Sequence, residues 1–482
     1  MFRSDLIIGG REGGFGGETF DRFNPVSGAV ASRTASAGVD DALAAADAAQ
    51  DAFAAWASIG PSDRRALLNA AADIIVAHHD DFVERMVAET GSTRGWASYN
   101  VQEGAAMFRE AAAMVTQIKG EVIPTNVPGN LSMAVRQPAG VCLGIAPWNA
   151  PVILGARAMA MPLACGNTVI LKTSEVCPAV HGLLGACLVE AGLDAGQVNV
   201  LHASAKDTPA VISALIEHSA VRRINFTGST RVGRIIAQQA AALLKPVLLE
   251  LGGKSPMVVL ESADLDKAVD AAIFGAFMNQ GQICMSTERI VVDRKVAAAF
   301  VEKFTARALA LTAKDPAVGD AELGAMASEA AAQRIDDLIA DAAARGASVI
   351  SKGARQGGIM QATIVDKVTP AMRIYAEESF GPVTTIVHAD DLAEAIRIAN
   401  DTDYGLSASV FGEDIAQATW VASQLRSGIC HINGPTVHDE PQMPFGGTKS
   451  SGFGRFGGAA GIDAFTELRW LTIQTGARHY PI

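Results

Sequence analysis

The chain has 482 residues, 49% of them hydrophobic, and a formal net charge of -12 at pH 7. At roughly 150 residues per domain, this length predicts about three domains with large buried cores. Because the chain is acidic and has no basic stripe, we expect neither nucleic acid nor a membrane surface as its partner.

The first third of the chain is rich in alanine and shows helical periodicity. Apolar residues recur at helical spacing over 40–57 and 62–89, with Pro61 as a start signal and Gly91 as a stop signal. We therefore expect one long helix in each range. The following segment, 121–137, is rich in Pro, Gly and β-forming residues and is typical of a hairpin arm.

The segment 141–171 is apolar and long enough to span a membrane. It contains three prolines, two asparagines and Arg157, which a single spanning helix would not carry. We interpret it instead as a strand, a loop, a helix and a second strand in a protein interior.

Short β-rich runs then alternate with helical patterns at 179–191 and 208–217. This alternation predicts βαβ units and a parallel sheet covered by helices on both faces. The β-rich runs lie at 141–146, 168–171, 198–201, 223–226 and 246–251.

The β/α pattern restarts after Gly253. Strands are expected at 257–260 and 289–292, with a helix at 263–278 between them. A second α/β domain is the simplest interpretation. The run 467–475 is predicted to be a terminal strand.

A glycine turn between a strand and a helix, at 224–233, is the first candidate site. Gly228 and Ser229 lie in this turn, where backbone N–H groups and the helix dipole suit a pyrophosphate. The glycine spacing is GxxxxG rather than GxGxxG, which by itself is weak evidence, and the local sequence favours the alternative of an ordinary capped helix after a strand.

Lys172 and Glu175 follow another expected strand, and ligands of open α/β sheets gather at the carboxyl ends of strands. This pair could hold ribose hydroxyls, and the carboxylate would repel the 2′-phosphate of NADP. The alternative is a solvated pair in a loop.

The six cysteines form no CxxC pair, and no secretory signal is recognisable, so we expect free thiols in a reducing cytoplasm. Cys284 differs from the other five because it follows a helical pattern and lies among Gly and Gln residues. A cysteine in such a polar loop is a candidate nucleophile.

Two further residues suit acyl chemistry beside such a thiol. Glu250 ends an expected strand just before two glycines and could act as a general base, the alternative being a solvated glutamate. The amide of Asn149 could donate to a developing oxyanion, the alternative being a helix N-cap.

Together these motifs resemble the aldehyde dehydrogenase superfamily from about residue 5 to the end. Order and spacing also fit, including the 34 residues from Glu250 to Cys284 (284 minus 250). Within the superfamily, the segments 121–124 and 428–440 resemble those of bacterial salicylaldehyde and vanillin dehydrogenases. One departure is Thr173, where many relatives have proline. The superfamily motifs lie at 147–149, 172 with 175, 226–230, 250–254, 281–284, 377–382 and 444–447.

The resemblance implies a fold, a cofactor and catalytic roles. Cys284 would be the nucleophile, Glu250 the general base, and Asn149 with the Cys284 N–H the oxyanion hole. The cofactor would be NAD. Its predicted contacts are Lys172 and Glu175 at the adenosine ribose, Gly228 and Ser229 at the pyrophosphate, Glu378 at the nicotinamide ribose, and Trp148 and Phe380 at its flanks.

The implied fold class is α/β: a Rossmann-like NAD-binding domain, a second α/β catalytic domain and a small β oligomerisation arm. The first domain would comprise 1–119 and 139–249, and the second 250–450. The arm and C-terminal segment would comprise 120–138 and 451–482. We expect a homodimer or a homotetramer, and no metal.

The helix after Asn149 is expected to line the aldehyde tunnel, since residues three to four apart share a helix face. Small Ala150 leaves room for a flat ring. Arg157 forms either a structural ion pair or a contact with a polar ring substituent such as a phenol. The other predicted wall residues are Ile153 and Leu154 on the same helix and, by family position, Trp96, Ile283, Met285 and Phe445.

We therefore expect NAD-dependent oxidation of an aromatic aldehyde, of the salicylaldehyde, vanillin or benzaldehyde type, to the acid through a Cys284 thioester. An aliphatic aldehyde or semialdehyde is the alternative substrate. A CoA-acylating dehydrogenase is disfavoured because its relatives usually lack the base that Glu250 supplies. The alternative from a different functional class is a non-catalytic binding or structural protein with the same fold.

Overall fold

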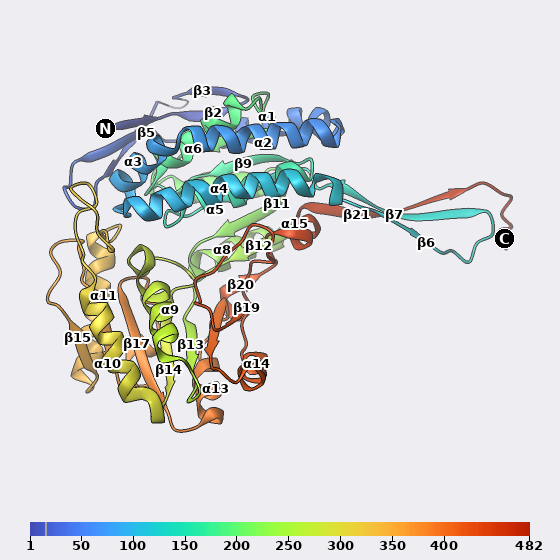
Figure 1. Cartoon of the computed structure of the whole chain (residues 1–482). Coiled ribbons are helices and arrows are strands. Elements are labelled where there is room, and N and C mark those ends of the chain that lie inside the picture. The colour runs from blue at the N-terminus through green and yellow to red at the C-terminus, as the bar shows by residue number, and fades with distance from the viewer. Residues whose placement is uncertain (15–16) are drawn as a thin grey trace.

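The computed structural model describes residues 1–14 and 17–482. Two α/β bodies lie one above the other in Figure 1, and a β arm projects from one side with the C-terminus at its tip. The predicted α/β class is therefore confirmed.

Five parallel strands form the centre of the first, eight-stranded sheet, whose order is β20-β12-β11-β8-β9-β10-β2-β3. The central strands are almost wholly buried, which explains their near-continuous apolar sequences. Both edges are antiparallel. The strands are β2 (Leu6–Ile8), β3 (Arg11–Gly13), β8 (Val141–Ile145), β9 (Thr168–Lys172), β10 (Val198–Leu201), β11 (Val221–Thr227), β12 (Val247–Glu250) and β20 (Gly452–Phe453).

Helices cover both faces of this sheet and bury two separate apolar cores. A small sheet of β1 (Phe2–Ser4), β5 (Val30–Ala35) and β4 (Thr19–Phe23) lies at the N-terminus. One face carries α1 (Val39–Ser58), α7 (Thr208–Glu217) and α8 (Thr230–Ala242), and the other α2 (Pro61–Ala77), α3 (His79–Thr90), α4 (Arg94–Met114), α5 (Pro151–Ala164) and α6 (Pro178–Glu190).

The expectation of one helix over 62–89 is wrong, because α2 ends and α3 begins at His78. The His78 backbone (φ -90°, ψ 21°) leaves the helical region. Periodicity could not show the break, since Leu68 and Ile75 before it and Phe82 after it pack into the same core. The stop signal at Gly91 is confirmed, because this residue caps α3 in the left-handed conformation.

The second sheet has seven strands in the order β15-β16-β17-β14-β13-β18-β19, and all but the edge strand β15 are parallel. Its strands are β13 (Ser255–Val259), β14 (Thr287–Asp293), β15 (Ser348–Ser351), β16 (Thr363–Asp366), β17 (Val383–Ala389), β18 (Ser407–Phe411) and β19 (Ile429–Ile432). The helices of this body are α9 (Leu265–Phe277), α10 (Arg294–Ala310), α11 (Glu329–Ala344), α12 (Arg373–Ala376), α13 (Leu392–Asn400) and α14 (Ile415–Gln424).

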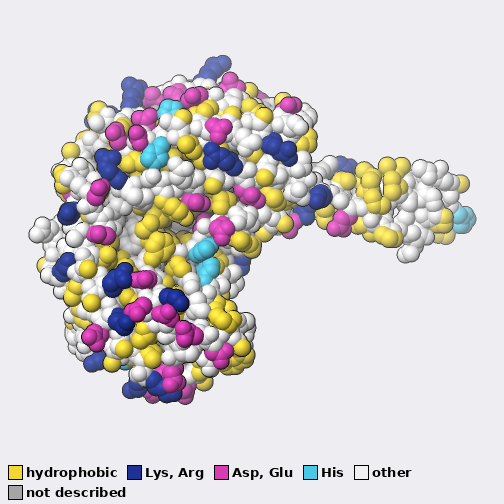
Figure 2. Space-filling view, viewed as in Figure 1, with side chains coloured by type: hydrophobic (Ala, Val, Ile, Leu, Met, Phe, Trp, Pro, Cys, Tyr) yellow, Lys and Arg dark blue, Asp and Glu magenta, His cyan; other side chains and the backbone are white. Residues whose placement is uncertain are grey.

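The arm is a three-stranded antiparallel sheet in which β7 (Asn130–Pro138) pairs with β6 (Glu121–Ile123) and β21 (Thr466–Gln474). Both expectations, a hairpin at 121–137 and a strand at 467–475, are confirmed. The short helix α15 (Gly458–Phe465) precedes β21. Hydrophobic side chains gather on the arm in Figure 2, and Trp470 is 76% exposed there.

The apolar segment 141–171 forms β8, α5 and β9, as expected. Its helix is buried along its whole length, and the Asn167 side chain bonds backbone groups at both ends of the segment. Within residues 1–14 and 17–482, no helix has the length and apolar character that crossing a bilayer requires.

A short link between the two bodies sets the position of the site. The chain passes from the end of β12 at Glu250 to the start of β13 at Ser255. The carboxyl edge of the first sheet therefore faces the amino edge of the second. Cys284 precedes β14 and Phe380 precedes β17 at that amino edge. Residues far apart in the sequence meet in this cleft.

Candidate active site

Cys284 lies in a tight turn between the 3-10 turn η2 (Met278–Gly281) and β14. Asn279, Gln280 and Gly281 all have positive φ angles of 48°, 53° and 68°. A Cβ on Gly281 would lie 2.0 Å from the carbonyl oxygen of Gly381, so glycine is required there. Such a left-handed run persists only where surrounding contacts hold it.

Asn149 is one of the groups that hold this turn. Its backbone oxygen accepts hydrogen bonds from Trp96 Nε1 (2.9 Å) and Asn279 Nδ2 (3.0 Å). Its own Nδ2 donates to the Gln282 carbonyl oxygen at 2.9 Å. Helix α5 has Ala150 as its N-cap residue, so the capping alternative for Asn149 is wrong. An amide has two N–H donors, which leaves one for a ligand.

Glu250 is only 2% exposed, so the alternative of a solvated glutamate is wrong. Its Oε1 accepts a 3.3 Å hydrogen bond from the Gly447 N–H, and Oε2 has no partner within the described chain. Burial raises the pKa of this carboxyl to about 8, although the charge of Arg157 opposes the shift. A pKa near neutral suits a general base.

The Cys284 thiol shares this environment. Burial raises its pKa to about 12, and the charge of Glu250 adds to the shift. The resting thiol is therefore protonated near neutral pH. Thiolate formation requires a nearby proton acceptor, and Glu250, which lines the same cavity as Cys284, is a candidate.

A cavity of about 160 Å³ opens on one side of Cys284. All eight predicted wall residues line it, including Arg157, and their roles in substrate binding stay predictions. Hydrophobic side chains floor this hollow between α4 and α9 in Figure 2, with acidic side chains at its rim. Seven further lining residues were not predicted: Tyr99, Glu103, Phe274, Met278, Val437, His438 and Asp439.

Some of these missed residues left a signal in the sequence. Tyr99 and Glu103 follow Trp96 at helical spacing on α4, and the Trp96 and Tyr99 rings stack with centroids 5.6 Å apart. Asp439 and its neighbours lie within the 428–440 motif. Only the fold brings that motif to the cavity.

A second cavity, of about 280 Å³, opens on the other side of Cys284. The two cavities share Asn149, Leu154 and Cys284. Of the predicted cofactor contacts, Trp148, Gly228, Ser229, Glu378 and Phe380 line the second cavity, together with Glu250. Cys284 therefore stands at the junction of the two cavities.

The remaining cofactor candidates, Lys172 and Glu175, lie outside this cavity at the carboxyl end of β9. Lys172 is buried, and its Nζ lies 3.8 Å from the half-exposed carboxylate of Glu175. A solvated pair is therefore the wrong description of Lys172. Ser229 caps α8, because its side chain accepts a hydrogen bond from the Val232 N–H at 3.4 Å. The same residue also lines the second cavity, so the two explanations do not exclude each other.

Glu378 and Phe380 lie in a turn that a buried ion pair supports. Lys254 Nζ lies 2.6 Å from Glu288 Oε2, and both side chains are buried. The Glu288 carboxylate also accepts from the backbone N–H groups of Ser379 (2.7 Å) and Phe380 (2.8 Å). Phe380 has a φ of 54°, a conformation that needs such support.

The same turn also contacts the link between the sheets. The Gly253 N–H donates to Glu378 Oε1 at 2.9 Å, and a Cβ on Gly252 would lie 2.6 Å from that carboxylate. Burial raises the pKa of Glu378 to about 7. The Phe380 ring meets Trp148 edge-on, with centroids 5.8 Å apart.

Arg157 forms an ion pair, which was one of the two roles predicted for it. Its guanidinium pairs with Asp439 and lies 4.1 Å from the centroid of the Phe445 ring. The side chain is only 6% exposed. The Arg157 cation in the cavity wall therefore already has a carboxylate partner.

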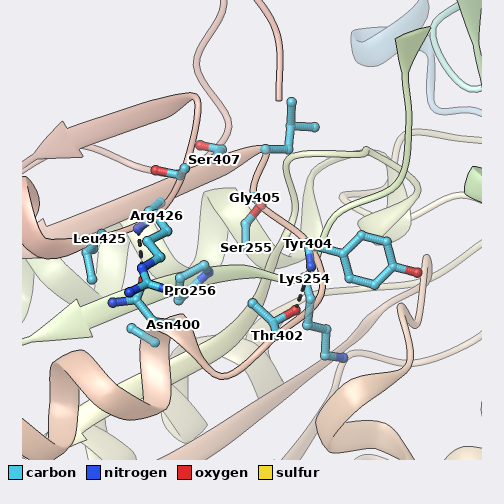
Figure 3. A pocket seen from close by; sticks show the side chains of 14 residues that line it. Lys254, Ser255, Pro256, Asn400, Thr402, Tyr404, Gly405, Ser407, Leu425 and Arg426 are labelled. Carbon is cyan, nitrogen blue, oxygen red and sulfur yellow. Dashed lines mark hydrogen bonds between the residues drawn. The ribbon is translucent and has the colours of Figure 1, made fainter. Parts of the chain in front are cut away.

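A third, separate cavity borders the far side of Lys254, between β13, β18 and the loop after α13. Figure 3 shows Asn400, Tyr404 and Arg426 around it. Its volume of about 10 Å³ holds one water at most. It contains none of the predicted site residues. No group of three or more potential metal ligands occurs in the described ranges, 1–14 and 17–482.

The fold and site define an α/β enzyme with a partly buried cysteine at the junction of two cavities, one of them largely apolar. Residues 14–471 match the model of the aldehyde dehydrogenase family. The chain is 56% identical to the vanillin dehydrogenase of Pseudomonas sp. strain HR199, over the whole of both chains.

Solved structures agree. The salicylaldehyde dehydrogenase of Pseudomonas putida G7, complexed with salicylaldehyde, is 50% identical with a TM-score of 0.98 and full coverage of both chains. PnpE, solved in complex with nicotinamide adenine dinucleotide, is 34% identical with a TM-score of 0.94 and 99% coverage of each chain. The chain belongs to the aldehyde dehydrogenase family, and it is an oxidoreductase that uses a nicotinamide dinucleotide.

The buried ion pair yields a prediction about cofactor binding. Glu288→Gln leaves the Lys254 ammonium buried without its anion, which costs about 3–5 kcal/mol and loosens the turn of Glu378 and Phe380. We expect the KM for the dinucleotide to rise about tenfold, equivalent to about 1.4 kcal/mol, with a smaller change in the KM for aldehyde. Quenching of tryptophan fluorescence by the dinucleotide measures the same loss without turnover.

The matched control is Glu261→Gln. Glu261 Oε2 also lies 2.6 Å from a lysine, Lys295, but that pair is exposed. Exposed pairs contribute about 0–1 kcal/mol, so this variant should leave both KM values unchanged. A folded Glu288→Gln enzyme with wild-type dinucleotide affinity would contradict the positioning role.

Proposed function

We propose that this enzyme oxidises an aromatic aldehyde to the carboxylic acid with NAD, through a thioester on Cys284. The observation that carries the proposal is the position of Cys284 where the two cavities meet. A thiol at that junction contacts an aldehyde on one side and a dinucleotide on the other.

The proposed chemistry begins with the protonated thiol. Glu250 accepts the proton of Cys284, and the sulfur adds to the aldehyde carbon. The free N–H of the Asn149 amide and the Cys284 N–H hold the oxygen that becomes negative, each worth roughly 3–4 kcal/mol in the transition state. A bound nicotinamide would accept the hydride that leaves this carbon, and the acyl group is left on sulfur as a thioester.

Glu250 then serves as base in the second half of the reaction. It first releases the thiol proton to solvent and then takes a proton from a water molecule, whose oxygen attacks the thioester carbon. The sulfur leaves and regains a proton as thiol. The acid carries the oxygen that came from water. The unpartnered Oε2 of Glu250 is the oxygen available to accept this water.

The choice of NAD rests on four features of this chain. The N-terminus of α8 lines the second cavity and suits a pyrophosphate. Glu378 offers a partly buried carboxylate to ribose hydroxyls at the nicotinamide end. Lys172 and Glu175, at the end of β9, suit the adenosine ribose. The Glu175 charge would repel a 2′-phosphate, which favours NAD over NADP.

The choice of an aromatic substrate rests on the first cavity. Trp96, Ile153, Leu154 and Phe445 make its walls apolar, and Ala150 leaves space for a ring beside Cys284. Two similar proteins, named above, are a vanillin dehydrogenase and a salicylaldehyde dehydrogenase solved with its aldehyde. Their substrates are of the size and polarity that this cavity suits.

We also propose a homodimer or a homotetramer formed through the arm. The arm exposes Trp470, Leu468 and Val122, and exposed apolar patches on a projecting sheet mark interfaces. We also propose that the chain is divided into the three domains that the sequence predicted. All six cysteines are free, which suits work in a reducing cytoplasm.

The base role of Glu250 is tested by its amide variant. Glu250→Gln should give a slowed burst of at most one NADH per active site followed by still slower turnover, because the variant lacks the acceptor for both the thiol proton and the water proton. Cys284→Ala is the matched control and should give no burst while still binding NAD. An unchanged steady-state kcat in Glu250→Gln would exclude the role.

The raised pKa of Glu250 predicts the pH profile. The base is the ionised carboxylate, so its activity is present above the pKa of about 8 and is lost as the pH falls below it. Steady-state kcat of the wild-type enzyme should therefore rise with pH and level off above about pH 8. In Glu250→Gln this inflection should vanish; an identical inflection in the variant would assign it to another group.

The cofactor choice is tested at Glu175. We expect the wild-type enzyme to prefer NAD over NADP at least about tenfold in kcat/KM, equivalent to about 1.4 kcal/mol of charge repulsion. Glu175→Gln removes the charge and keeps the hydrogen-bonding oxygen, so the preference should shrink mainly through a lower KM for NADP. Equal use of both dinucleotides by the wild-type enzyme would overturn the assignment.

The substrate class is tested with matched aldehydes. We expect kcat/KM for benzaldehyde to exceed that for acetaldehyde at least about tenfold, a gap of about 1.4 kcal/mol that several apolar contacts to a ring can supply. Cyclohexanecarbaldehyde, similar in apolar area but not flat, should fall between them. Acetaldehyde matching benzaldehyde would remove the aromatic assignment and leave the family membership intact.

A further inference from the structure

The wall of the aldehyde-side cavity carries an excess of negative charge. Its charged members are one cation, Arg157, and two carboxylates, Glu103 and Asp439. Their formal sum is -1 (1 minus 2). The rest of the wall is apolar or neutral and does not screen these charges as water would.

The cation is not free to receive a second anion. Arg157 pairs with Asp439, and its guanidinium carbon lies 4.1 Å from the centroid of the Phe445 ring and 5.8 Å from that of the Phe456 ring. Turning it toward a substrate carboxylate would leave Asp439, itself only 16% exposed, without its partner. Breaking a buried pair in this way is strongly unfavourable.

Asp439 retains one unused acceptor. Its Oδ2 faces Arg157, whereas its Oδ1 is buried and has no hydrogen-bond partner among the described residues. A buried carboxylate oxygen without a donor is costly, and a donor on a ligand removes that cost. A neutral phenolic O–H on the ring is such a donor.

Glu103 adds the second carboxylate. It lies on α4, seven residues after Trp96 and on the same helix face, and forms no ion pair within the described chain. Burial raises the pKa of Glu103, and the charges of Asp439 and Glu440 add to the shift. It therefore faces like charges and no cation of its own.

We propose that Glu103 and Asp439 select substrates by their charge. The two carboxylates admit neutral aromatic aldehydes, favour those with a ring hydroxyl, and exclude aldehydes that carry a carboxylate. This inference rests on the proposed function and refines its substrate class. The physical reason is repulsion between a substrate carboxylate and a wall whose cation is already neutralised. In this proposal the phenol is recognised by Asp439, whereas the sequence predicted that contact as one of two roles for Arg157.

The test compares 4-formylbenzoate with its methyl ester, which keeps the para substituent and removes the charge. In the wild-type enzyme, kcat/KM should be at least about tenfold higher for the ester, equivalent to about 1.4 kcal/mol. Glu103→Gln should reduce this ratio at least about threefold. Glu110→Gln, the same change seven residues further along α4 in a neighbouring cavity, should reduce it less. A ratio near one in the wild-type enzyme, or one unmoved by Glu103→Gln, overturns the proposal.

Binding separates this inference from the proposed function. In Cys284→Ala, which cannot form the thioester, calorimetry should give a weaker Kd for the acid than for the ester. Failure of benzaldehyde turnover in the wild-type enzyme would refute the proposed function, whereas equal Kd values for acid and ester would refute the charge selection alone.

The hydroxyl preference has its own comparison. 3-Hydroxybenzaldehyde should have a higher kcat/KM than 3-methoxybenzaldehyde at a pH where the phenol is neutral, because only the hydroxyl donates. Asp439→Asn should reduce that ratio, and circular dichroism should first establish that the variant folds. Equal kcat/KM for the two aldehydes in the wild-type enzyme would refute the role of Asp439.

Discussion

The buried ion pair between Lys254 and Glu288 is the interaction on which the site depends. Lys254 lies on the link that joins the two sheets, and Glu288 lies four residues after Cys284 at the start of β14. The same carboxylate holds the N–H groups of Ser379 and Phe380. One pair of charges therefore ties together the inter-sheet link, the strand that follows Cys284 and the turn of Glu378 and Phe380. A buried pair of this kind contributes geometry more than stability, because desolvation offsets much of its attraction.

The geometry that results is a cleft with two different sides. The carboxyl edge of the first sheet supplies Glu250 and the α8 N-terminus, and the amino edge of the second supplies Cys284 and Phe380. Since both cavities open at Cys284, the thiol borders both of them. Burial raises the pKa values of both Cys284 and Glu250, so the thiol is protonated near neutral pH while the carboxyl titrates close to it.

Much of this arrangement could be predicted because it rests on local patterns. The alternation of apolar runs with helical stretches predicted the parallel sheets, and glycine turns and strand ends marked Ser229, Glu250 and Cys284. The break at His78 could not be predicted, because both helices pack on one core and periodicity continues across it. The Arg157–Asp439 pair was equally out of reach, since 282 residues separate its members. Sequence spacing carries no information on which distant carboxylate neutralises a buried cation.

The amino-acid sequence by itself determined the α/β class, the arm, the family and the identity of the chemical groups, because each depends on residue types at short spacing. Tertiary structure alone decided which groups meet. It placed Glu288 against the turn that contains Phe380, paired Arg157 with Asp439, and brought Glu103 to the same cavity from another helix. Charge balance in a cavity is a property of distance and burial, and both are set only when the chain folds.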